Sequence, residues 1–228
     1  GYKYLFSVFI LQYPKTLTFF EWVRTLPSDI RPRTIALWCE KAMESEELYE
    51  TYTKHAEEYG LKVVLKEEYV RLMKDFTPLI VKTKALNPDI VNILAVPPDF
   101  ITIMNQCKES AYYPKLFHVE KATDIGELPP DLTNYATLAT HWTEELPYAQ
   151  EMLKDYIKRY NERPTIFAPC DVADIEVLAQ AIERAGTLDK DEIAKVLRTS
   201  TFSTVLGPIK FNPDGSVNLK YYLSLIHI

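Results

Sequence analysis

The chain has 228 residues, of which 47% are hydrophobic and 25% are charged, so it can bury a core and does not have the composition of a disordered segment. Its net charge of −6 and its pI near 5.4 argue against a nucleic-acid partner, because phosphate binding requires a basic face. The sequence contains no run of 18 or more apolar residues, the length that a membrane-spanning helix requires.

The first 65 residues alternate between apolar runs and amphipathic stretches. Residues 4–10 are apolar and aromatic and predict a strand, and residues 16–26 predict a helix that Pro27 closes. Residues 33–39 (RTIALWC) have the β-rich pattern of a buried parallel strand. A charged helix over 45–59 and a strand over 61–65 follow, so the chain begins as an alternation of strands and helices.

The alternation continues through the middle of the chain. Asp75 is the predicted N-cap of a helix over 76–86, and a continuous apolar strand follows over 89–96. Asp99 is the predicted cap of the next helix, and residues 115–119 predict another strand. The residues expected to point inward from that helix are Phe100, Ile103, Met104 and Cys107. Such a βαβ succession with short links predicts a parallel sheet.

The pattern changes after Glu120. A loop over 121–134 and a strand over 135–142 lead to three amphipathic helices, predicted over 147–160, over 171–185 with Asp171 as cap, and after a capping box of Asp189 and Glu192. GPIKFNPDGSVN, residues 207–218, predicts a hairpin around a Pro-Asp-Gly turn. Because three such helices have no strands of their own here, we expect apolar faces over 147–199 to remain uncovered.

Few residues are arranged for chemistry. His118 and Glu120 alternate on a strand and share a face, but the other histidines provide no third metal ligand. There is no GxSxG motif, and only six glycines are present, without a Gly-rich phosphate loop. Asp171 and Asp174 could be read as paired carboxylates, although Asp171 stands where a helix cap belongs. We therefore expect no enzyme, no cofactor and no metal.

The three cysteines, Cys39, Cys107 and Cys170, are widely spaced and odd in number. This spacing is neither a disulfide framework nor a CxxC metal site. We expect buried thiols that behave as small apolar side chains.

A ligand site is expected where the parallel strands end, because open α/β sheets bind ligands beyond their carboxyl ends. In this sequence those ends are residues 39–44, 96–99 and 119–120. A carboxylate there suits an ammonium group, and helix N-termini suit a carboxylate, so together they would suit a zwitterion.

Five short segments give the chain a family resemblance. They are Asp75-Phe76-Thr77 before a helix, Leu86-Asn87-Pro88-Asp89 before a strand, AQAIERAG at 179–186, Gly207-Pro208 to Phe211, and Pro213-Asp214-Gly215. In this order the chain resembles the substrate-binding proteins of branched-chain amino acid ABC transporters, over nearly its whole length to Tyr222.

The resemblance implies the α/β, parallel-sheet fold of type I periplasmic binding proteins, with one near-complete lobe and part of the other. Residues 1–142 would be the second lobe, 143–206 the returning helices of the first lobe, and 207–222 a hairpin leading to the hinge. Residues 223–228, LSLIHI, are the in-frame translation of a transposon end used to prepare sequencing libraries. We therefore expect these six residues to be a non-native tail and the chain to be a fragment.

The resemblance also implies a function. Such a protein captures an amino acid or a similar small carboxylate by hinge closure and delivers it to an ABC transporter permease. It works in the periplasm or outside the cell, in some cases on a lipid anchor, and has no catalytic residue. The alternative is the ligand-binding sensor domain of a receptor or of an amide-responsive regulator with the same fold.

Six residues are the expected ligand contacts. By position, Glu120 matches the residue that holds the α-amino group of the ligand in the family. Met43, Glu44, Val96, Pro97 and Pro98 match positions that often carry pocket aromatics, and none of them is aromatic in this chain.

Overall fold

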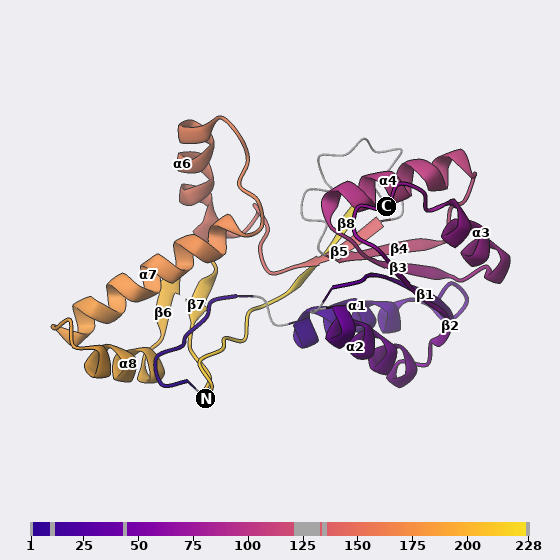
Figure 1. The fold of residues 1–228 in the computed structure, drawn as a ribbon. Coiled ribbons are helices and arrows are strands. Elements are labelled where there is room, and N and C mark those ends of the chain that lie inside the picture. The colour runs from indigo at the N-terminus through magenta and orange to yellow at the C-terminus, as the bar shows by residue number, and fades with distance from the viewer. Residues whose placement is uncertain (1, 10–11, 43–44, 121–132, 134–135, 227–228) are drawn as a thin grey trace. The chain divides into compact units, whose positions relative to one another are not determined.

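The computed structural model describes residues 2–9, 12–42, 45–120, 133 and 136–226 (Figure 1). The chain forms two compact units. Unit 1 comprises Gly1–Leu11 and Thr140–Tyr222, and unit 2 comprises Gln12–Ala139 and Leu223–Ile228. The chain therefore passes from one unit to the other three times.

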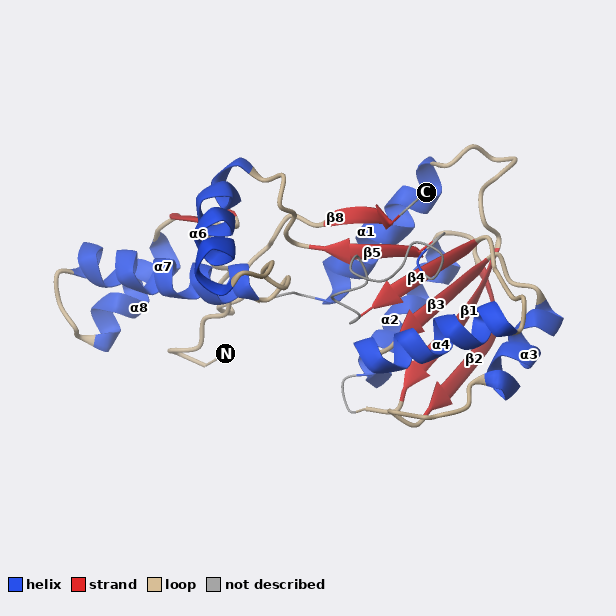
Figure 2. Cartoon of the chain, turned by 90° about the horizontal axis from the view of Figure 1, so that it is seen from above, coloured by secondary structure: helices blue, strands red, loops and turns tan. Residues whose placement is uncertain are grey.

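Unit 2 is built on a six-stranded sheet with the strand order β2-β1-β3-β4-β5-β8 (Figure 2). Its β1–β2, β1–β3, β3–β4 and β4–β5 pairs are all parallel, which confirms the predicted parallel α/β sheet. The strands are β1 (Thr34–Glu40), β2 (Lys62–Tyr69), β3 (Ile90–Leu94), β4 (Leu116–Glu120), β5 (Ala136–Thr140) and β8 (Tyr222–Ile226).

Helices cover both faces of this sheet (Figure 1). One face carries α1 (Gln12–Thr25) and α2 (Ser45–Glu58), and the other carries α3 (Thr77–Leu86) and α4 (Pro97–Glu109). The step from β1 to β2 runs one way across the sheet, whereas the steps to β3 and β4 run the other way. Because parallel crossovers are right-handed, this reversal places α2 on the face opposite α3 and α4.

Each face has its own apolar core. The core under α3 and α4 contains Trp38, Phe76, Ile80, Val91 and Phe117. The four residues predicted to point inward from α4, namely Phe100, Ile103, Met104 and Cys107, are all buried in it, as predicted. The core under α1 and α2 contains Phe19, Phe20, Leu37, Leu48 and Tyr52.

Two predicted helix caps behave differently from expectation. Helix α3 begins at Thr77, with Phe76 as its N-cap residue, but Asp75 Oδ1 still accepts the Thr77 N–H at 2.9 Å. Asp99 is not a cap, because α4 already begins at Pro97. The buried Asp99 carboxylate instead accepts the Leu72 N–H, at 2.9 and 3.1 Å to its two oxygens. It thereby fixes the loop after β2, where Leu72 adopts a positive φ of 62°.

Unit 1 contains three helices and a small antiparallel pair. The 3₁₀ turn η2 (Pro147–Ala149) leads into α6 (Gln150–Tyr160), followed by α7 (Ala168–Ala185) and α8 (Lys190–Thr199). Asp189 Oδ1 accepts the N–H groups of Asp191 and Glu192, so the predicted cap of α8 is confirmed. Asp171 is not the cap of α7, because that helix begins three residues earlier.

The hairpin region is shorter than predicted. Within 207–218 the strands reduce to β7 (Gly207–Ile209) and one antiparallel bridge between Phe211 and Val217. The principal partner of β7 is β6 (Phe202–Thr204), which the sequence pattern did not reveal. In the Pro-Asp-Gly turn, Gly215 has φ of 88°, and a Cβ there would lie 2.1 Å from the Leu5 carbonyl oxygen. The turn therefore requires glycine.

The predicted strand over residues 4–10 is wrong for the residues that the structure describes. Residues 4–9 form no strand. They are held by unit 1 through edge-to-face packing of Phe6 on Phe211 and a bond from Ser7 N–H to the Gly215 carbonyl. The Val8 N–H donates to Asp174, and the Val8 side chain is buried. The apolar residues that predicted a strand are thus buried by side-chain packing rather than in a sheet.

The two units divide the chain at Leu11, at Ala139 and at Tyr222. The predicted division into lobes after residues 142, 206 and 222 stays a prediction. The last residues described, 223–226, belong to β8. Which unit corresponds to which lobe, and the origin of residues 223–228, remain predictions.

Several apolar side chains of unit 1 are exposed. Helix α6 is amphipathic, yet none of its residues is buried. The exposed apolar residues of η2, α6 and α7 are Tyr148, Ile157, Tyr160, Ile175 and Leu178. This agrees with the expectation of uncovered apolar faces over 147–199. Across the described residues, no helix combines the length and apolarity needed to cross a bilayer.

A matched pair of valines tests the sheet core. Val91 in β3 is fully buried, whereas Val81 on α3 is 59% exposed. Val91→Ala should lower the free energy of unfolding by about 2 kcal/mol, because it removes buried methyl groups and leaves a cavity. Val81→Ala should change it by less than about 0.5 kcal/mol. Chemical denaturation followed by tryptophan fluorescence measures both, and equal effects would contradict the assigned core.

Candidate functional site

The carboxyl ends of the central strands form one row. In the sheet register, Cys39 of β1 lies beside Leu94 of β3, and Leu94 lies beside Glu120 of β4. The chain order reverses between β1 and β3, which makes this edge a topological switch point. Open α/β sheets bind ligands beyond such a point.

The structure places four of the six predicted ligand residues. Val96 is the N-cap residue of α4, Pro97 and Pro98 open that helix, and Glu120 ends β4. A bond of 3.2 Å from the Ala95 N–H to the Glu120 carbonyl joins the two strand ends. The chain therefore brings these four residues to one edge of the sheet. Met43 and Glu44 lie outside the described residues.

These four residues differ in their exposure to solvent. Val96 and Pro97 are half-buried and Pro98 is exposed, whereas Glu120 is fully buried. Val96, Pro97 and Pro98 can thus present an apolar surface at the edge. The Glu120 side chain contacts Lys15 of α1 and Tyr52 of α2, on the face of the sheet opposite α4.

Both oxygens of the Glu120 carboxylate have protein partners. Oε2 forms an ion pair with the Lys15 ammonium of α1, and Oε1 accepts a hydrogen bond from the Tyr52 hydroxyl of α2. The Lys15 side chain is 5% exposed and that of Glu120 is 1% exposed. This is a buried ion pair, which is held by its hydrogen bonds as much as by its charges.

His118 extends this cluster. It shares a face of β4 with Glu120, as predicted, and its Nε2 lies 3.0 Å from Tyr52 Oη and 3.5 Å from Glu120 Oε1. Its Nδ1 lies 2.9 Å from Thr137 Oγ1. The Phe19 ring stacks on the imidazole with centroids 3.7 Å apart. A proton on Nε2 lets His118 donate to Tyr52 while Tyr52 donates to Glu120.

The surroundings shift the protonation equilibria of this cluster. Burial alone would raise the pKa of Glu120, but the Lys15 charge and the neighbouring His118 outweigh it and lower that pKa to about 2. Burial lowers the pKa of His118 and, with the charge of Glu120, raises that of Tyr52. Glu120 is therefore ionised, and His118 and Tyr52 are neutral near neutral pH.

Local periodicity explains how the groups meet. Lys15 and Phe19 are four residues apart on α1 and share a face, and His118 and Glu120 are two apart on β4. The sequence analysis did not assign Lys15 or Tyr52 to the site. One signal was available for Lys15, because a cation in the first turn of a helix opposes the helix dipole and requires another reason to be there.

A second polar cluster stabilises the same edge. Arg71 donates two hydrogen bonds, of 2.9 and 3.0 Å, to the two oxygens of the buried Glu40 carboxylate at the end of β1. Together with the Asp99–Leu72 contact, this pair fixes the loop that follows β2. We regard the cluster as structural, because each of its carboxylates already has a geometrically good partner.

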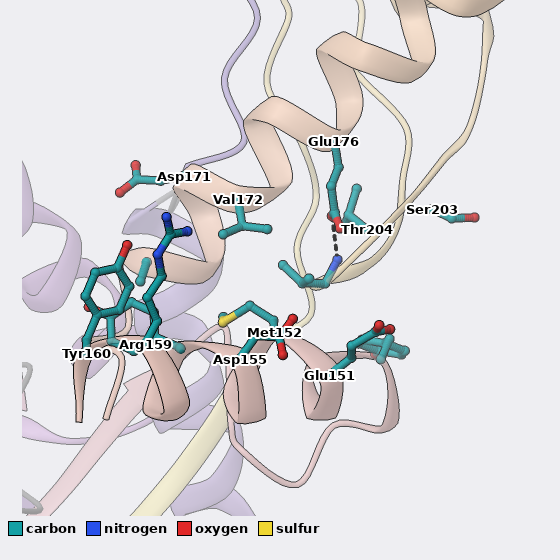
Figure 3. Close-up of a pocket in the computed structure, with 14 residues that line it drawn as sticks. Glu151, Met152, Asp155, Arg159, Tyr160, Asp171, Val172, Glu176, Ser203 and Thr204 are labelled. Carbon is teal, nitrogen blue, oxygen red and sulfur yellow. Dashed lines mark hydrogen bonds between the residues drawn. The ribbon is translucent and has the colours of Figure 1, made fainter. Parts of the chain in front are cut away.

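Two hollows lie elsewhere. A groove of about 780 Å³ in unit 1 runs between α6 and α7, with Met152, Arg159 and Val172 in its lining (Figure 3). At its far end, Glu176 accepts the Val205 N–H at 2.9 Å. A smaller hollow of about 340 Å³ in unit 2 lies near the end of β2. Neither contains a predicted ligand residue.

The described residues contain no group of three or more His, Cys, Asp and Glu side chains that could hold a metal ion. All three cysteines are buried and outside disulfides, as expected. Cys170 Sγ lies 3.1 Å from His141 Nε2, but burial and the nearby Asp174 and Asp171 raise the pKa of this thiol to about 12. A thiol in this state is a poor nucleophile.

Known proteins match the chain along almost its full length. A family model described as "Periplasmic binding protein" matches residues 1–226. A leucine-, isoleucine-, valine-, threonine- and alanine-binding protein of Pseudomonas aeruginosa is 26% identical over 82% of this chain and 51% of its own length. A Leu/Ile/Val-binding protein homolog of Brucella suis is 24% identical over 83% of this chain and 52% of its own. The chain thus spans about half the length of these relatives.

Solved structures show the same fold. A leucine binding protein from Thermotoga maritima has a TM-score of 0.82 at 18% identity, over 99% of this chain and 65% of its own. A solute binding protein from R. palustris in complex with benzoate has a TM-score of 0.84 at 13% identity, over 97% and 62%. A branched-chain amino acid binding protein from Streptococcus pneumoniae in complex with isoleucine has a TM-score of 0.79 at 16% identity, over 97% and 64%.

The buried cluster predicts a dependence of stability on pH. The folded-state pKa values of Glu120 and His118 lie below the ordinary values of 4.5 and 6.5 for these side chains, so between the two values the unfolded chain binds protons that the folded chain does not bind. The free energy of unfolding should therefore fall as pH drops below about 6.5, and by roughly 3 kcal/mol more between about 4.5 and 2. Denaturation with urea across this range measures it.

The control is the double variant Lys15→Met/Glu120→Gln, which removes both charges together. It should reduce the loss below about pH 4.5, to which Asp75 and Asp89 with their lowered pKa values still contribute, and keep the loss that His118 causes above it. If the double variant and the unaltered chain lose equal stability in the acid range, Glu120 is not the group responsible.

Proposed function

Because the chain belongs to the periplasmic binding protein family, we propose that it serves as the solute-binding component of an ABC transporter. In this role it captures an amino acid or a similar small carboxylate by hinge closure and delivers it to a permease. The observation that carries the proposal is the family match over residues 1–226. The family and the fold are those of non-enzymatic solute-binding proteins.

We place the ligand at the carboxyl edge of the unit 2 sheet. Val96, Pro97 and Pro98 would form an apolar wall, with Met43 and Glu44 contributing from the segment after β1. Glu120 would act from the α1 and α2 side of the sheet, through the cluster that it forms with Lys15 and Tyr52. The topological switch point and the single row of strand ends support this placement.

Two kinds of ligand occur among the similar structures, isoleucine in one and benzoate in another. Both are small carboxylates, and the pocket positions of this chain lack aromatic residues. The proposed ligands therefore include both amino acids and small carboxylic acids without an amino group. We also propose a periplasmic or extracellular location, in line with the named role of the family.

The three passages of the chain between the units would provide the hinge. A few residues at element ends absorb most of the rotation in hinge closure. The passages at residues 11–12, 139–140 and 222–223 are such ends or lie beside them.

Ligand-dependent stabilisation of the full-length gene product tests this function. A panel of amino acids and small carboxylic acids should contain at least one solute that raises the unfolding temperature. At 100 times its dissociation constant, that solute should add about 2.7 kcal/mol to the free energy of unfolding. Neutral sugars of similar size are the control and should have no effect. Deleting the gene should abolish uptake of the same solute.

Other outcomes would contradict the proposal. If sugars stabilise the protein and carboxylates do not, the solute class is wrong. If a carboxylate binds but uptake survives the deletion, the sensor alternative replaces transport. Turnover of a bound solute would make the protein an enzyme.

A further inference from the structure

The ion pair between Lys15 and Glu120 affects which class of carboxylic acid the protein can bind as its ligand. This inference rests on the proposed function, since it concerns the same edge of the sheet. In the family, the residue at the position of Glu120 is expected to hold the ammonium group of an amino acid. In this chain the ammonium group beside Glu120 belongs to the protein itself.

The pair is built into the fold. Lys15 lies in the first turn of α1. Its Nζ contacts Oε2 of Glu120, which lies 105 residues later in the sequence. Both side chains are almost completely buried. Tyr52 engages the second oxygen, and Phe19, one turn after Lys15, packs on His118 beside it. Lys15 is thus paired with Glu120 inside a cluster that both neighbouring helices and β4 contribute to.

This arrangement leaves little attraction for a second cation. Lys15 neutralises the Glu120 charge, and Tyr52 and Lys15 engage both of its oxygens. A ligand ammonium at hydrogen-bond distance from Glu120 would also stand close to the Lys15 ammonium, which is paired with the same carboxylate. At an effective dielectric constant of about 20, two like charges at about 4 Å weaken binding on the order of a thousandfold.

We infer that Lys15 takes the place of the ligand ammonium group at Glu120, and that the solute is a small carboxylic acid without an α-amino group. Lys15 is then a specificity-determining residue. The chemical class comprises 2-oxo acids, saturated acids and aromatic acids of amino-acid size. An amino acid of the same shape carries an additional ammonium group. The Glu120 carboxylate is already paired with Lys15, so the ligand ammonium gains no ion pair there and is repelled by the Lys15 charge.

Matched ligand pairs test the inference by isothermal titration calorimetry on the full-length gene product. The pairs are leucine with 4-methyl-2-oxopentanoate, and phenylalanine with 3-phenylpropanoate; benzoate is titrated as well. The amine-free member should bind at least about tenfold more tightly in a pair that binds. Equal or tighter binding of the amino acid overturns the inference and leaves the proposed function intact. Binding of none of these acids overturns the inference, whereas the proposed function is overturned only if the wider panel of amino acids and carboxylic acids fails as well.

Substitution of Lys15 gives a second readout. Lys15→Met frees the Glu120 carboxylate, so the preference should shift by about tenfold or more toward the amino acid of each pair. Lys62→Met is the matched control, since Lys62 is exposed at the amino end of β2 and should leave the ratio unchanged. An unchanged ratio in Lys15→Met overturns the inference, because a purely structural lysine would affect both ligands equally.

The single variant leaves Glu120 buried without a counter-charge and is at risk of unfolding. The double variant Lys15→Met/Glu120→Gln removes both charges and retains the packing. It should bind the amine-free acid but gain no affinity for the amino acid, because no carboxylate is exposed to it. A gain in amino acid affinity by this double variant would contradict the role of Glu120.

Discussion

The parallel register of β1, β3 and β4 is the constraint on which the rest of unit 2 depends. It aligns Cys39, Leu94 and Glu120 in one row and so gathers the strand ends at one edge. Because all three strands are buried on both faces, their side chains are fixed from above and below. A shift by one residue in β4 would turn His118 and Glu120 toward the opposite helix layer, away from Lys15 and Tyr52. The polar cluster therefore exists only in this register.

The same register explains why a polar cluster is tolerated inside an apolar layer. Phe19, Phe20 and Leu48 belong to the apolar layer on the α1 and α2 face. Within the cluster, each polar side chain forms a hydrogen bond or an ion pair with another member. Buried polar groups are stable only when they are paired. The cluster runs from Thr137 through His118 and Tyr52 to Glu120 and Lys15, and thus links two strands to two helices.

Much of the fold was predictable from local patterns. The strands and helices of residues 33–119 follow from apolar runs, prolines and caps, and their alternation implies the parallel sheet. The errors share one cause, which is that local sequence does not specify the partner. Residues 4–9 have a strand-like composition but pack on Phe211 and Asp174, which lie far along the chain. Asp99 has the sequence position of a helix cap, but its carboxylate accepts a hydrogen bond from the Leu72 N–H.

The site was predictable only in part for the same reason. The carboxyl-end rule led to residues 39–44, 96–99 and 119–120, because it needs only the strand order, and the family resemblance singled out Val96, Pro97, Pro98 and Glu120 among them. The partners of Glu120 were not predictable, because Lys15 and Tyr52 lie 105 and 68 residues away in the chain. A lysine in the first turn of a helix was the one local anomaly that pointed to such a contact.

The buried pair also constrains how this lineage can change. Removing one member of a buried ion pair typically costs 3–5 kcal/mol, whereas replacing both with apolar residues is often neutral. Lys15 and Glu120 are therefore expected to be replaced together rather than one at a time. Two distant positions of the gene are thus coupled through one buried contact, because the loss of either residue alone leaves the other charge buried without its partner.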